Sequence, residues 1–153
     1  MEDFYRAHAR AVHAFLHGLC RNRDTAEDLM QETFVRATRA MGGYRGGSPR
    51  AWLFAIARTT FLDATRRDTP EPVEEPPVTS SRDPDVAEAE TVRRALARLP
   101  EAQRAALVLG DQLEVPYAEI GQVLGRSEGA VKVLIHRARA SFRRAYEEEG
   151  GHA

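Results

Sequence analysis

Residues 117–142 read YAEIGQVLGRSEGAVKVLIHRARASF, and this stretch decides how the chain folds. Its first eight residues predict a short helix with one apolar side. Gly125 then predicts a tight turn, because glycine adopts a positive φ angle without strain. Ser127 is placed to cap the helix that follows. The apolar residues of that second helix recur at intervals of four, three and four: Val131, Ile135, Ala138 and Phe142. The whole pattern is that of a helix-turn-helix.

The opposite side of the second helix is polar and mostly basic. It carries Glu128, Lys132, His136, Arg137, Arg139 and Arg143. Arginines on such a helix pair with phosphates, while side chains near its N-terminal end reach base edges in the major groove. Charge alone would favour a helix face that merely contacts water. The turn chemistry beside it favours DNA binding.

The first 67 residues predict three helices. The first carries Phe4, Phe15 and Leu19 on its inner side. The second extends to about residue 41 and is expected to be capped by Asp24 or Thr25. A glycine-rich loop over residues 42–47 follows, and then a third helix with Ser48 as its cap and Pro49 in its first turn.

Between these helices and the helix-turn-helix lies a segment that cannot form a packed element. Residues 68–85 contain five prolines, several acidic residues and no aromatic residue, a composition typical of a semi-extended linker. Helical spacing returns from about Val86. The predicted fold is all-α, with a helical domain at 1–67, a flexible linker at 68–90 and a helix-turn-helix domain at 91–149.

The 153 residues have a net charge of −1, which argues against a uniformly basic coat for nucleic acid. The charge is unevenly distributed, however. Residues 1–67 hold eleven arginines and seven acidic residues, a net charge of +4, whereas residues 68–90 have a net charge of −7 and residues 91–153 of +2. Because acidic segments repel DNA, contacts with DNA are expected on the two flanking domains.

Other classes of protein find little support. Cys20 is the sole cysteine, no signal peptide is evident and no apolar run could span a bilayer, so a cytoplasmic protein is expected. His13, His17 and Cys20 share one helical face, but a fourth zinc ligand is lacking and we predict no metal site. Phosphate loops and catalytic motifs are also lacking, so we predict neither a cofactor nor an enzyme.

Two blocks of sequence carry a resemblance to a known family. The first is AEDLMQETF (residues 26–34), followed by WLFAIAR (residues 52–58). The second comprises LPEAQR (residues 99–104), the helix-turn-helix and HRAR (residues 136–139). In this order and spacing, the chain resembles the small extracytoplasmic-function class of bacterial sigma factors. The resemblance covers about residues 4–67 and 91–146.

This resemblance implies a transcription initiation factor that gives core RNA polymerase its promoter preference. The expected partners are the clamp and flap of core polymerase, promoter DNA and an anti-sigma factor, and the free protein is expected to be a monomer without membrane insertion. The implied contacts with polymerase are Glu27, Asp28, Gln31 and Glu32. The implied contacts with the minus-35 element are Ser127, Glu128, Gly129, Lys132, Val133, His136, Arg137 and Arg139. The implied contacts with the minus-10 element, including its melted strand, are Arg45, Ser48, Arg50, Trp52, Arg58, Arg66 and Arg67.

Some positions depart from the family pattern. Gly121 and Ala130 replace the usual Ala and Thr, and Val133-Leu134 replaces a common Ser-Arg pair. Leu134 lies off the apolar stripe, so we expect its side chain to face the groove, where it could meet a thymine methyl. Trp52 suits a core position better than a wedge between bases. Two alternatives stay open: a conventional helix-turn-helix regulator, and a degenerate sigma factor that reads promoters weakly.

Overall fold

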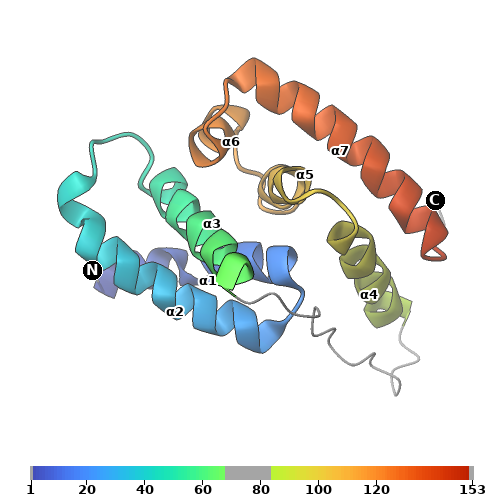
Figure 1. Ribbon diagram of the computed structural model, residues 1–153, viewed down its shortest axis with the longest axis horizontal. Coiled ribbons are helices and arrows are strands. Elements are labelled where there is room, and N and C mark those ends of the chain that lie inside the picture. Colours follow the sequence, from blue (N-terminus) through green and yellow to red (C-terminus); the bar gives the residue numbers. More distant parts are fainter. Residues whose placement is uncertain (1, 68–83, 152–153) are drawn as a thin grey trace.

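The computed structural model describes residues 2–67 and 84–151, and every regular element in these two ranges is helical (Figure 1). The α-helices are α1 (Glu2–Cys20), α2 (Arg23–Ala40), α3 (Pro49–Arg67), α4 (Pro84–Ala97), α5 (Glu101–Leu107), α6 (Tyr117–Leu124) and α7 (Glu128–Glu148). A short 3₁₀ turn, η1 (Met41–Gly43), follows α2, and a π-helical segment, η2 (Val108–Gln112), continues α5. The predicted all-α fold is confirmed.

The first three helices form a bundle around aromatic and aliphatic side chains. Helix α1 packs against both α2 and α3, which also pack against each other. Phe15 and Phe54 are fully buried and meet edge to face, with ring centroids 5.4 Å apart. Such aromatic pairs stabilise a core beyond the area that they bury.

The cap of α2 differs from the prediction. Asn22, not Asp24 or Thr25, occupies the cap position, and its side-chain oxygen accepts a hydrogen bond from the Thr25 amide at 2.9 Å. The reason is the backbone: Asn22 is extended, with φ −130° and ψ 120°, whereas the helix already begins at Arg23. Asp24 therefore lies inside the first turn, where its negative charge suits the helix dipole.

The second bundle contains the helix-turn-helix. Helices α5 and α6 both pack against α7, and α4 contacts the later part of α7. Gly125 adopts the left-handed conformation, with φ 67°, between α6 and α7. The Ser127 side chain accepts a hydrogen bond from the Ala130 amide at 3.1 Å, so both the predicted turn and the predicted cap are confirmed.

The π-helical segment η2 was not indicated by any sequence pattern. The Leu113 amide donates to the Val108 carbonyl at 3.0 Å, five residues back, which widens the helix by one residue. Gly110 lies in this segment, and a Cβ there would come within 3.2 Å of Ile135 and 3.3 Å of Ile120. The small residue thus lets η2 approach both helices of the helix-turn-helix.

Helix α4 begins earlier than the predicted domain boundary. Residues 84–90 form its first turns, so the linker predicted at 68–90 does not extend that far. Pro84 occupies the first helical position and Asp85 the first turn, both favourable at a helix start. The rest of the predicted linker, residues 68–83, lies outside the described residues.

The two bundles pack directly against each other. Helix α6 lies against α3, while α4, α5 and η2 lie against α1 (Figure 1). The approach of α1 to η2 is close: a Cβ on Gly18 would lie 2.7 Å from Cγ2 of Val108. The buried apolar residues of both bundles consequently form one continuous cluster. Within residues 2–67 and 84–151, we find no helix with the length and apolar character needed to cross a membrane.

Candidate nucleic-acid and polymerase interfaces

The outward side of α7 presents the predicted recognition residues to solvent. Every residue predicted to contact the minus-35 element is exposed: Ser127, Glu128, Gly129, Lys132, Val133, His136, Arg137 and Arg139. Arg139 is also engaged within the protein, because its guanidinium donates to both oxygens of Asp111 at 2.7 and 3.0 Å. These hydrogen bonds raise the pKa of Arg139 above its ordinary value. Asp111 therefore orients this arginine from η2.

The expectation for Leu134 is wrong. Its side chain is buried, with 9% exposed, whereas that of its neighbour Val133 is 49% exposed. Leu134 packs three residues after Val131 and four before Ala138, which makes it part of the inner stripe of α7. The exposed apolar side chain on the recognition face is therefore Val133.

Three residues predicted to contact the minus-10 element are held by carboxylates of the second bundle. Ser48 caps α3, its oxygen accepting from the Ala51 amide at 3.1 Å, and its hydroxyl donates to Glu119 of α6. Arg50 donates to the other oxygen of Glu119 at 2.8 Å. The hydrogen bond from Ser48, together with the one from Arg50, lowers the pKa of Glu119.

Arg58 makes the most regular of these contacts. Its Nε and one terminal nitrogen each donate to a different oxygen of Glu101 at 2.8 Å. This two-point arrangement matches a planar guanidinium to a carboxylate or a phosphate. Both side chains are about one-fifth exposed, at 21% and 22%.

The other predicted minus-10 residues are not brought together with these three. Arg45 and Arg67 are exposed, and Arg66 is exposed and pairs with Asp63 on its own helix at 2.6 Å. Trp52 is half-buried against Phe4 and Tyr44, with ring centroids 6.5 and 5.4 Å away. Packing at the edge of the bundle therefore accounts for Trp52.

Helix α2 exposes the residues predicted to contact polymerase. Glu27, Asp28, Gln31 and Glu32 all face solvent. Val35 extends this face by one turn and is 44% exposed, although its side chain is large and apolar. Sequence patterns did not single out Val35, but its place four residues after Gln31 would have assigned it to the same side of the helix. We call these five residues the α2 face.

Comparison with known proteins identifies the family. Residues 4–70 match Sigma-70 region 2, and residues 89–142 match Sigma-70 region 4. The RNA polymerase sigma factor YlaC of Bacillus subtilis is 31% identical, over 94% of this chain and 90% of its own length. The extracytoplasmic-function sigma factor SigM of Mycobacterium tuberculosis is 33% identical, over 94% of this chain and 75% of its own. The chain belongs to the extracytoplasmic-function sigma factors.

The solved structures agree with this assignment. The sigma factor RpoE of Bartonella quintana, determined in complex with the anti-sigma factor NepR, superposes with a TM-score of 0.75 at 25% identity. The match covers 96% of this chain and 98% of that one. Our sigma factor therefore acts in promoter-directed transcription initiation, and sigma factors are not enzymes.

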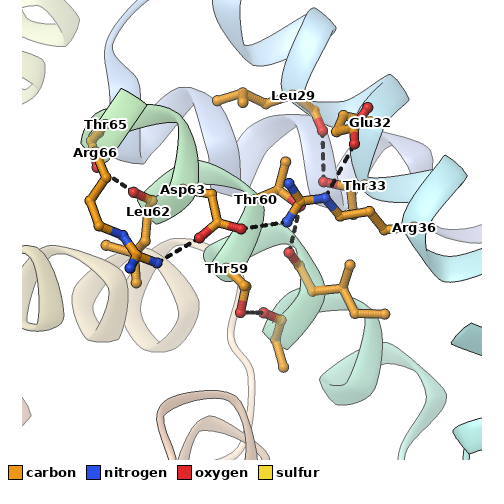
Figure 2. A network of polar contacts seen from close by, with 12 residues as sticks. Leu29, Glu32, Thr33, Arg36, Thr59, Thr60, Leu62, Asp63, Thr65 and Arg66 are labelled. Carbon is orange, nitrogen blue, oxygen red and sulfur yellow. Dashed lines mark hydrogen bonds and ion pairs between the residues drawn. The ribbon is translucent and has the colours of Figure 1, made fainter. Parts of the chain in front are cut away.

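A polar network joins the α2 face of this sigma factor to α3 (Figure 2). Arg36 donates to Glu32 at 3.2 Å and to Asp63 at 2.8 Å, and Asp63 also accepts from Arg66. The hydrogen bond from Arg36 lowers the pKa of Asp63, and the one to Asp63 raises the pKa of Arg36. Glu32 and Arg66, predicted to serve different partners, are thus joined by three contacts that run through Arg36 and Asp63.

The candidate zinc ligands do not converge. The rings of His13 and His17 stack with centroids 6.1 Å apart, and the Cys20 thiol donates to the Asn22 carbonyl at 3.3 Å. In the part of the chain that the structure describes, no three side chains of the metal-binding types gather around one point.

Proposed function

We propose that this sigma factor binds core RNA polymerase through the α2 face and reads promoters with both domains. The α2 face is acidic with one apolar side chain, a composition that suits a basic partner surface with an apolar contact. In this proposal residues 1–67 dock on the clamp and open the minus-10 element. Residues 91–149 bind the flap and read the minus-35 element.

The observation that carries the proposal is the pairing of two surfaces on one chain. One is the exposed side of α7, which follows a capped turn and presents cations beside Gly129 and Val133. The other is the α2 face, which lies away from the second bundle because α2 packs on α1, α3 and η1. A conventional helix-turn-helix regulator needs only the first of these surfaces.

One further partner belongs to the same proposal. An anti-sigma factor is supported by the likeness to the Bartonella quintana protein, which was determined with one. Action in the cytoplasm follows from binding to core polymerase. We propose no cofactor.

Binding to core polymerase tests the α2 face. Replacing Asp28 and Glu32 with arginine reverses two of its charges, and we expect the affinity of the labelled protein for core polymerase to fall at least about tenfold. A variant with Glu114 and Glu147 replaced by arginine serves as the control, because it makes the same charge change on the second domain. Equal affinities of the two variants would contradict the docking assignment.

The assignment of α7 is tested separately by selecting promoters from a randomised library with polymerase and this sigma factor. Replacing Lys132 and Arg137 with alanine should weaken selection at the upstream element while leaving the downstream preference unchanged. An altered downstream preference would contradict the division of labour between the domains. Core binding without any selected promoter would indicate a degenerate sigma factor.

A further inference from the structure

The interface between the two bundles uses three of the side chains assigned above to the minus-10 element. Glu119 of α6 accepts from both Ser48 and Arg50, and Glu101 of α5 accepts two hydrogen bonds from Arg58. Ser48 and Arg50 lie at the start of α3, and Arg58 lies more than two helical turns further along it. Their carboxylate partners lie on α5 and α6, so the contacts line the side of α3 that faces the second bundle.

The chemistry of these contacts imitates that of a nucleic-acid backbone. A carboxylate on a guanidinium fork presents two oxygens, as a phosphate does, and it occupies the same N–H donors. While Glu101 holds Arg58, the two nitrogens that face it are unavailable to a phosphate. Glu119 likewise occupies one nitrogen of Arg50 and the hydroxyl of Ser48.

Other contacts hold the bundles in this position. Arg21 at the end of α1 pairs with Glu90 of α4 at 3.3 Å, and both side chains are largely buried. Arg104 of α5 donates to the Leu19 carbonyl of α1 at 2.5 Å. Gly18 meets Val108 in close apolar contact. Isolated surface ion pairs contribute little, but here the pairs are partly buried and supported by apolar packing.

We infer that the second domain competes with nucleic acid for the first: Glu101 and Glu119 occupy Arg58, Arg50 and Ser48 until the domains separate. The inference rests on the proposed assignment of these three residues to single-stranded promoter DNA. The α2 face lies outside the interface, so the closed protein can still meet core polymerase. The structure thus favours an order of events in which docking on polymerase precedes exposure of the DNA-binding side of α3.

The expected effect follows from population shift. If most molecules are closed, the apparent affinity for DNA is lowered by the fraction that is open. Removing the charges of Glu101 and Glu119 should raise the affinity of the free protein for single-stranded DNA about tenfold. The change in net charge alone should raise it less than about threefold.

The experiment uses the full chain and a fluorescein-labelled pool of random single-stranded 30-mers, with affinity read by anisotropy. The variant is Glu101→Gln with Glu119→Gln, and the matched control is Glu114→Gln with Glu147→Gln, two exposed acids of the same domain. Small-angle X-ray scattering of each protein measures whether the domains separate. Circular dichroism confirms that each variant keeps its helices.

A second variant opens the interface without a change of charge. Gly18→Leu places a side chain where a Cβ alone would lie 2.7 Å from Val108. It should raise the radius of gyration and tighten DNA binding to a similar extent. A change in net charge alone could not explain tighter DNA binding by both variants, because Gly18→Leu leaves the charge unchanged.

Each outcome decides a different point. Expansion together with tighter DNA binding in both variants supports the inference. Expansion with unchanged DNA binding would overturn it by removing these three residues from the DNA site, while leaving docking on polymerase intact. A compact Gln variant that binds DNA no better than its control would overturn the competition itself.

Discussion

A single arginine joins three chain segments, and its replacement gives the sharpest test of the packing. The guanidinium of Arg104 donates to the carbonyls of Leu96, Ala97 and Leu99 at 3.0, 3.3 and 3.1 Å, and to that of Leu19 at 2.5 Å. The last carbonyls of a helix lack partners within that helix. Arg104 therefore satisfies the ends of α4 and α1 together. Burial lowers the pKa of Arg104 below its ordinary value.

The cost of Arg104→Met can be worked out from these contacts. In the variant, the Leu96 carbonyl still accepts a hydrogen bond from the Leu99 amide at 3.1 Å. The other three carbonyls, those of Leu19, Ala97 and Leu99, lose the hydrogen bond that Arg104 provides. Each carbonyl left unpaired costs about 1 kcal/mol or more. Packing of the Met side chain returns less than about 1 kcal/mol. We expect the free energy of unfolding to fall by about 2–3 kcal/mol.

Urea unfolding followed by circular dichroism measures this loss. Arg104→Lys keeps the charge but not the planar fork, so we expect it to lose about 1–2 kcal/mol. Arg126→Met, at an exposed position in the turn before α7, should change stability by less than about 0.5 kcal/mol. A loss below about 1 kcal/mol for Arg104→Met would refute the view that this residue satisfies the two helix ends.

Three further changes have defined outcomes. Gly121→Ala should lower stability by about 1 kcal/mol in urea unfolding, because the new Cβ would lie 2.5 Å from the Arg126 carbonyl oxygen and this overlap outweighs the gain in helix propensity; a more stable variant would contradict that geometry. Val133→Ser should weaken selection of thymine at one upstream promoter position in a library assay, and an unchanged preference would exclude methyl readout. The hydrogen bonds from Ser48 and Arg50 lower the pKa of Glu119 below its ordinary value of 4.5. The stability that Glu119 adds to the domain interface is therefore full above pH 4.5 and is lost as the pH falls further. Small-angle X-ray scattering should show that acid expands Glu119→Gln less than it expands the unmodified protein. Equal expansion of the two proteins would contradict this role of Glu119.

Much of the fold is accessible from sequence because its signals are local. Helical spacing and the Gly125–Ser127 turn depend on neighbouring residues, so they predict the helix-turn-helix without tertiary information. The cap at Asn22 was missed because several capping residue types occur in succession there and only the backbone decides among them.

The interface between the bundles could not be predicted in the same way. Glu101 and Glu119 look like ordinary helix-surface acids in the sequence, and their partners are 43 and 69 residues away. Leu134 was misplaced because the inner stripe of α7 is one residue wider than the four positions that spacing alone picked out. The π segment at Val108–Gln112 shifts the phase of the chain and leaves no compositional trace.

Run-off transcription with bacterial core polymerase and a randomised promoter library tests the central claim most directly. We predict specific transcripts from a discrete set of promoters when this sigma factor is present, and none when it is omitted. Tight binding of duplex DNA by the protein alone, with no binding to core polymerase and no transcripts, would contradict the account.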